Sequence, residues 1–240
     1  MIKGIIFDFG GTIDTDGIHW EKLLKKTILD LGVIIDDSTF HHIYVEAEKR
    51  LERNLIIDSS DTLQTTLYKK IEIELSILDK ITNSNHNNKT TIENIVRKLY
   101  TFVRSRIEQN YETLQQLKKD YPLALVTNYY GNIESILKEF NLSDHFSVII
   151  ESQRVGIRKP DPTIFQMAID KLNLRPSEVL VIGDSYQNDI LPAQFCGCKT
   201  LWLTQETNPE PEIIKTLQTV RKIISCINLD RRKKSIESTH

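Results

Sequence analysis

The sequence is poor in the residues that mark specialised protein classes. Its 240 residues include only 3 cysteines, 9 glycines and 7 prolines, too few for a disulfide scaffold, a collagen-like repeat or a low-complexity chain. The cysteines, at positions 196, 198 and 226, are odd in number and lack the spacing of metal or redox sites. We therefore expect free thiols and a cytoplasmic location.

A large excess of one charge and long apolar runs are also missing. The formal net charge is −2, which provides no basic field to attract nucleic acid. The short apolar run at the start is interrupted by Asp8, so it predicts a buried strand and neither a signal peptide nor a membrane span. We expect chemistry on a small molecule, without nucleic-acid or membrane partners, and the sequence leaves the oligomeric state open.

The sequence does contain an alternation of short apolar runs and helical stretches. The runs are continuous and rich in β-branched residues, as in parallel strands that are buried on both faces. They lie at residues 2–7, 123–126, 148–150, 179–182 and 200–203. Helical stretches follow at residues 132–140, 162–172, 189–196 and 210–224. This alternation predicts an α/β fold, a Rossmann-like doubly wound parallel sheet with right-handed crossovers.

A long helical segment separates the first apolar run from the second. Within it, Leu23, Leu24 and Ile28 share one helical face, and later stretches continue the same periodicity. Strand-like runs are scarce in this segment. We predict a smaller helical cap domain at residues 17–102, inserted after the first strand, and a catalytic core made of residues 1–16 and 103–240.

Polar side chains follow the predicted strands at the ends where such sheets place their ligands. They are Asp8 after the first strand, Thr127 and Asn128 after the second, Lys159 after the third, and Asp184 and Asp189 after the fourth. Carboxylates, a hydroxyl and a lysine at one edge suit a phosphate with a divalent metal. Asp8 is placed to attack phosphorus and to share Mg²⁺ with Asp184, while Thr127 and Lys159 contact phosphoryl oxygens.

Four stretches, in order, resemble the motifs of the haloacid dehalogenase superfamily: IIFDFGGTID, LALVTN, GIRKPDPTIF and VIGDSYQND. The resemblance implies a magnesium-dependent hydrolase that acts on a small phosphorylated substrate. It also implies an aspartyl-phosphate intermediate on Asp8, with Mg²⁺ held by Asp8, Asp184 and the main-chain carbonyl of Gly10. A helical insertion after the first motif is similar to the cap of that superfamily.

The same resemblance implies roles for the remaining motif residues. The phosphate and the rest of the substrate are expected to contact Gly11, Thr127, Asn128 and Lys159. Asp189 resembles the second acidic residue of the fourth motif, which orients the metal-bound waters and the lysine. Each of these residues, taken alone, also suits a strand end, a turn or a helix cap. Their order and their places after strands favour the functional interpretation.

The sequence departs from the superfamily pattern at Gly10, where most phosphatases of the superfamily have a second aspartate as the acid and base. Three hypotheses follow. The first is a phosphatase whose acid or base lies elsewhere, at Asp14, at Asp16 or in the cap, or whose substrate has a good leaving group. The second is a metal-independent, dehalogenase-like enzyme that attacks carbon, and the third is a non-catalytic phosphate-binding or regulatory protein. Asp184 argues against the second hypothesis, and the otherwise intact set of motif residues argues against the third.

Overall fold

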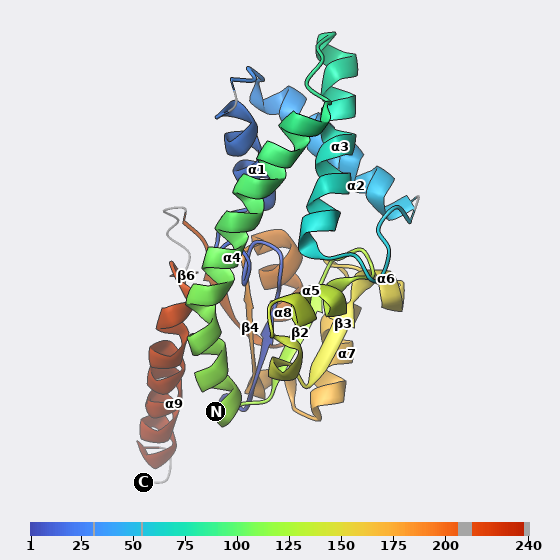
Figure 1. Ribbon diagram of the computed structural model, residues 1–240. Helices are drawn as coiled ribbons and strands as arrows, with labels where there is room; N and C mark the ends of the chain where they lie inside the picture. The colour runs from blue at the N-terminus through green and yellow to red at the C-terminus, as the bar shows by residue number, and fades with distance from the viewer. Residues whose placement is uncertain (31, 54, 206–212, 238–240) are drawn as a thin grey trace. The chain divides into compact units, whose positions relative to one another are not determined.

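The computed structural model describes residues 1–30, 32–53, 55–205 and 213–237 (Figure 1). The chain divides into two compact units. The first, here called the sheet unit, consists of Met1–Ile18, Arg106–Asn128 and Asp144–His240. The second, the helical unit, consists of His19–Ser105 and Tyr129–Ser143.

The sheet unit is built on a six-stranded parallel sheet with the strand order β3-β2-β1-β4-β5-β6. The strands are β1 (Gly4–Phe7), β2 (Leu123–Thr127), β3 (Val148–Glu151), β4 (Val179–Gly183), β5 (Lys199–Leu203) and β6 (Ile213–Ile214). The first five coincide with the apolar runs of the sequence. The predicted α/β class with a doubly wound parallel sheet is confirmed.

The central strands are buried on both faces, which explains their unbroken apolar sequences. Every residue of β1, β2 and β4 is buried. Helix α7 (Thr163–Leu172) covers one face with Ile164, Phe165 and Ile169, which pack in the same cluster as Ile6 and Val126. The described helices of this unit also include α6 (Ser152–Val155), α8 (Leu191–Phe195), α9 (Val220–Glu237) and the second part of α4 (Lys89–Asp120).

The chain after β5 differs from the helix predicted at residues 210–224, of which 210–212 lie outside the described residues. Ile213 and Ile214 form β6, which pairs with the end of β5. A 3₁₀ turn, η4 (Leu217–Thr219), comes next, and α9 begins only at Val220. The amide of Leu217 donates to Asp16 Oδ1 (3.2 Å). Pairing with the sheet edge and this distant contact outweigh the local helical pattern.

The helical unit contains α1 (Trp20–Leu29), α2 (Asp37–Arg53), α3 (Leu63–Thr82), the first part of α4 (Lys89–Asp120) and α5 (Ile133–Glu139). Helix α2 packs against α3. Buried residues recur at helical spacing along α3, among them Ile71, Leu75 and Leu78. No helix within the described ranges has the length and the apolar content needed to cross a membrane.

The segment that follows β2 groups with these helices, and polar contacts fix it there. Asn132 Nδ2 donates to the Asp61 carbonyl (3.0 Å) and to Thr66 Oγ1 (2.8 Å). At the end of α5, the Glu139 carboxylate accepts from the Leu63 amide (2.8 Å). These bonds join residues more than 60 positions apart in sequence.

Candidate active site

Three neighbouring strands bring candidate side chains to one edge of the sheet. Asp8 directly follows β1, Asp184 directly follows β4, and Thr127 is the last residue of β2. Because β1 lies between β2 and β4 and all three run parallel, these residues leave the sheet at the same edge. The Asp8 amide also donates to the Ile182 carbonyl (3.0 Å), which holds Asp8 close to β4.

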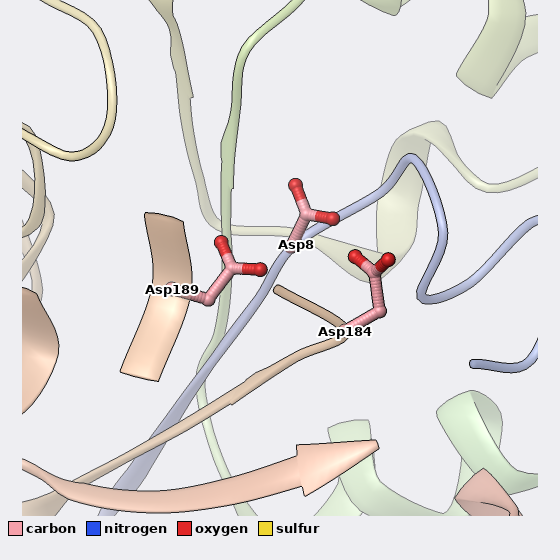
Figure 2. Close-up of side chains that lie close together, drawn as sticks. All are labelled: Asp8, Asp184 and Asp189. Carbon is pink, nitrogen blue, oxygen red and sulfur yellow. The ribbon is translucent and has the colours of Figure 1, made fainter. Parts of the chain in front are cut away.

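Asp8, Asp184 and Asp189 form a compact carboxylate cluster, shown in Figure 2. One oxygen of each residue lies within 4.8 Å of those of the other two. Asp189 belongs to a π-helical turn, η3 (Tyr186–Ile190), and its Oδ2 accepts from the Ser185 amide (3.0 Å). Asp8 and Asp189 are buried, and Asp184 is half-buried. Three carboxylates at this spacing repel one another unless cations lie beside them.

Lys159 provides one positive charge to this cluster. Its Nζ lies 2.5 Å from Asp8 Oδ1 and 2.6 Å from Asp189 Oδ1, and the residue is only 4% exposed. Burial opposes the charged form of Lys159, but the attraction of Asp189 and Asp8 outweighs it, so the pKa of Lys159 is raised. The ammonium is therefore a permanent charge between two of the three carboxylates.

The surroundings also shift the pKa values of the two carboxyl groups at the strand ends. Burial raises the pKa of Asp8 to about 6, although the charge of Lys159 acts in the opposite direction. Burial, together with the negative charges of Asp189 and Asp8, raises the pKa of Asp184 well above its ordinary value. A divalent cation favours the ionised forms and so relieves this repulsion. The all-oxygen donor set therefore suits Mg²⁺.

Two glycines lack side chains at positions where any side chain would overlap the carboxylates of the cluster. A Cβ on Gly11 would lie 2.2 Å from Asp184 Oδ2, and the backbone φ of Gly11 is +92°, a conformation that other residues rarely adopt. A Cβ on Gly183 would lie 2.4 Å from Asp189. Gly10, predicted as a metal ligand through its carbonyl, is half-buried in the turn after Asp8.

Thr12 is a site residue to which the sequence argument gave no role. Its hydroxyl donates to Asp8 Oδ2 (3.1 Å) and lies 3.5 Å from Asp184 Oδ1, although 172 positions separate Thr12 from Asp184. Thr12 is fully buried. The sequence signal that could have identified Thr12 is its position within the first motif, four residues after Asp8. The contact with Asp184 depends on the pairing of β1 with β4.

The second motif contacts the third through Asn128. The Asn128 side chain donates to the Lys159 carbonyl (3.0 Å) and accepts from the Lys159 amide (2.9 Å). Asn128 thus fixes the backbone from which Lys159 reaches the carboxylates. Thr127 is buried at the end of β2, opposite Glu151 in the register with β3. The predicted contacts of Gly11, Thr127 and Asn128 with a substrate remain predictions.

Asp14 and Asp16, the proposed substitutes for the missing acid, have different surroundings. Asp14 is fully buried, its Oδ1 accepts from the Gly11 amide (2.7 Å), and its charge contributes to the raised pKa of Asp184. Asp16 accepts instead from the Leu217 amide at the far end of the chain. The charge of Asp14 therefore acts on the carboxylate cluster. Asp16 instead connects the turn after β1 to the C-terminal segment through Leu217.

A profile of haloacid dehalogenase-like hydrolases matches residues 2–197. The chain belongs to this family of hydrolases, as the four motifs indicate.

The chain is also similar to curated phosphatases over part of its length. It is 34% identical over 94 residues to a phosphoserine phosphatase from Thermus thermophilus, covering 39% of this chain and 38% of that protein. It is 39% identical over 99 residues to a phosphoglycolate phosphatase from Pectobacterium atrosepticum, covering 40% and 42%. The matched segments thus span about two-fifths of these relatives.

A solved structure extends the similarity of fold to nearly the whole chain. The protein YfnB from Bacillus subtilis, solved with bound magnesium, superposes with a TM-score of 0.61. The match covers 93% of this chain and 99% of YfnB at 18% sequence identity. At this identity the likeness establishes the fold alone.

Proposed function

We propose that the protein is a magnesium-dependent phosphatase of a small phosphorylated compound, with Asp8 as the nucleophile. The observation that carries this proposal is the cluster of Asp8, Asp184 and Asp189 around the Lys159 ammonium at the carboxyl edge of the sheet. The partial similarity to curated phosphatases and the bound magnesium of YfnB support the same choice.

The proposed reaction has two steps. An oxygen of Asp8 attacks phosphorus, the bond from phosphorus to the leaving oxygen breaks, and the leaving oxygen takes up a proton. Water then attacks the phosphorus of the aspartyl phosphate, which releases inorganic phosphate and restores Asp8. With a pKa of about 6, Asp8 is mostly ionised at neutral pH and ready for the first step.

The other side chains position and neutralise charge. The Thr12 hydroxyl donates to Asp8 Oδ2 and the Lys159 ammonium donates to Asp8 Oδ1. Lys159 also lies where it can balance charge on the transferring phosphoryl group. Asp8, Asp184 and the Gly10 carbonyl are the proposed ligands of Mg²⁺, which shields the nucleophile from the negative charge of the phosphate. Asp189 orients Lys159 through their 2.6 Å contact.

Gly10 is the observation that keeps a second candidate function open. Glycine offers no proton to the leaving group, and loss of a positioned acid typically lowers the rate by about 10²- to 10⁴-fold. A phosphate-binding protein without turnover needs no such acid. Within the enzyme proposal we take Asp14 as the substitute acid, because its charge acts on Asp184 whereas Asp16 accepts from Leu217.

A screen of phosphorylated metabolites with Mg²⁺, repeated with a metal chelator, tests the proposal. We expect phosphate release from at least one compound and its loss with the chelator. Halide release from 2-haloacids without metal would favour the dehalogenase-like alternative instead. Tight, Mg²⁺-dependent binding of phosphate compounds without any turnover would favour the binding protein.

A further inference from the structure

Trp202 of the sheet unit contacts the candidate active site, although it lies outside the four sequence motifs. It belongs to β5, and the strand register places it beside Gly183 of β4, the residue before Asp184. The indole Nε1 of Trp202 donates to the main-chain carbonyl of Asp184 at 2.7 Å. This distance is at the short end of the range for an N–H donor. The contact therefore joins β5 directly to the backbone of a proposed Mg²⁺ ligand.

The peptide group between Asp184 and Ser185 is held at both of its polar atoms. Its carbonyl accepts from Trp202, and its N–H donates to Asp189 Oδ2 at 3.0 Å. Hydrogen bonds in such a chain polarise one another, so donation to the carbonyl strengthens the N–H as a donor. Bonds on both sides also restrict rotation of the peptide. The Asp184 side chain thus starts from a defined position.

The chain of hydrogen bonds continues through the charged part of the site. The other carboxylate oxygen of Asp189 accepts from Lys159 Nζ at 2.6 Å, and the same ammonium donates to Asp8 Oδ1 at 2.5 Å. A continuous series of bonds therefore runs from β5, past the end of β4, to the proposed nucleophile after β1. Trp202 is the end of this series that carries no charge.

The three carboxylates repel one another in the arrangement that a divalent cation needs. One oxygen each of Asp8, Asp184 and Asp189 lies within 4.8 Å of the other two. Repulsion between like charges separates carboxylates whose backbone is free to move. Bonds that hold the Asp184 main chain keep its carboxylate near Asp8 before a cation arrives. Binding of the cation then requires less reorganisation of the protein.

Tyr186 packs against the indole and keeps it in place. The two ring centroids are 5.1 Å apart and the ring planes are tilted by 52°, within the range that aromatic pairs favour. Tyr186 begins the η3 turn, two residues after Asp184. Both rings are half-buried. Many apolar side chains fill a half-buried position on a strand, so the directed N–H is what tryptophan adds at position 202.

We propose that Trp202 is a positioning residue for the metal site: its indole N–H holds the main-chain carbonyl of Asp184 and thereby raises the affinity for Mg²⁺. This rests on the proposed function, in which Asp184 and Asp8 bind the cation. Trp202 acts through the backbone of Asp184. The same contact makes the indole a reporter, because a cation at Asp184 changes the electric field at a ring that is hydrogen-bonded to that residue.

Calorimetric titration of Mg²⁺ into the native protein, Trp202→Phe and Trp20→Phe tests the effect on affinity. Phenylalanine keeps an aromatic ring but lacks the N–H. Trp20 lies on α1 of the helical unit and is the other tryptophan of the chain, so it is the matched control. We expect about 10-fold weaker binding by Trp202→Phe, within the range for outer-sphere partners of a metal, and native affinity for Trp20→Phe. Circular dichroism and thermal unfolding establish that each variant is folded.

The Mg²⁺ dependence of turnover separates positioning from a general packing defect. On a substrate from the metabolite screen, Trp202→Phe should need about 10-fold more Mg²⁺ for its half-maximal rate. At saturating Mg²⁺ its kcat should return close to that of the native protein. A kcat that stays low at every Mg²⁺ concentration, together with native Mg²⁺ affinity, would assign Trp202 to packing alone and overturn the inference.

Fluorescence provides a second measurement that leaves Trp202 unchanged. In Trp20→Phe, all tryptophan emission comes from Trp202. We expect Mg²⁺ to change this emission in a saturable manner, with the affinity that calorimetry gives. Adding Asp184→Ala in the same background should shift the response to much higher Mg²⁺ concentrations. This measurement decides the matter even where Trp202→Phe does not fold.

Two results overturn the inference: folded Trp202→Phe binds Mg²⁺ as tightly as the native protein, or Trp202 emission does not respond to Mg²⁺ that calorimetry shows to bind. Failure of the phosphatase proposal has a different signature, which is no phosphate release from any compound while the Mg²⁺ affinity still depends on Trp202. A native protein that binds no Mg²⁺ would refute the metal site and the role of Trp202 together.

Discussion

The two units each bury a lysine among carboxylates, but they satisfy those carboxylates differently. In the sheet unit, Lys159 bridges Asp8 and Asp189 at 2.5 and 2.6 Å. In the helical unit, Lys70 pairs with Glu48 and leaves Glu74 without a hydrogen bond among the described residues. The pKa values follow this difference: burial raises that of paired Asp8 to about 6 and that of unpaired Glu74 to about 8.

The comparison shows how a neighbouring cation changes the state of a buried carboxyl group. A nucleophile must be ionised near neutral pH, so a lysine beside it is an advantage. Glu74 has no hydrogen-bond partner among the described residues, and burial raises its pKa above neutral pH. Changes to the carboxylate cluster of the sheet unit should therefore abolish chemistry, whereas a change at Glu74 should alter the pH dependence of stability.

The largest effect is expected for Asp8→Asn, which should abolish phosphate release while the protein stays folded. The amide is nearly isosteric with the carboxylate but does not attack phosphorus. The measurement is turnover on a substrate from the metabolite screen, with exposed Asp144→Asn as the control. Native turnover by Asp8→Asn would exclude Asp8 as the nucleophile.

Asp184→Ala should weaken Mg²⁺ binding on the order of 100-fold, since outer-sphere partners alone typically change metal affinity by about 10- to 100-fold. Titration calorimetry with Mg²⁺ measures the change. Equal affinities of the native protein and the variant would place the metal elsewhere.

Glu74→Gln should change how stability depends on pH. In the folded protein the pKa of Glu74 is about 8, above its ordinary value of 4.5, so the folded state holds the proton more tightly. This contribution to stability is complete below pH 4.5 and is lost as the pH rises through about 8. At about 1.4 kcal/mol per pKa unit, the loss amounts to a few kcal/mol.

Urea unfolding of the native protein, Glu74→Gln and, as the control, Glu72→Gln at an exposed position of the same helix measures the difference between these pH values. The groups that face Glu74 are Lys70 on the same helix and Glu48 on α2. The free energy of unfolding of Glu74→Gln should fall less with rising pH than those of the other two proteins. Parallel curves for all three would show that Glu74 titrates normally.

A gain of activity is expected for Gly10→Asp alone, which should raise turnover of alkyl phosphates with poor leaving groups by about 10-fold, less than the full effect of a positioned acid. Phosphates of acidic phenols should gain less in the first step, because a phenolate leaves without a proton. Steady-state rates on both substrate classes test this. A folded, Mg²⁺-binding Gly10→Asp variant that is no faster on either class would indicate that a resident group such as Asp14 already serves as the acid.

Local sequence determined most of the sheet and much of the candidate site. Buried parallel strands need unbroken apolar runs, and the carboxyl ends of neighbouring strands meet at one edge. These two rules were enough to predict five strands and to bring together Asp8, Lys159, Asp184 and Asp189. Both rules depend on residues that are adjacent along a strand, so they can be applied to the sequence directly.

Only the tertiary structure decided the contacts between distant segments. Ile213 and Ile214 form a strand because the edge of β5 is there to pair with, and Thr12 contacts Asp184 because β1 lies beside β4. In the sequence, Glu74 has the pattern of an ordinary charged residue on a helix. Its burial next to Lys70 and its lack of a partner follow from how α2 and α3 pack, a relation between side chains that no local pattern encodes.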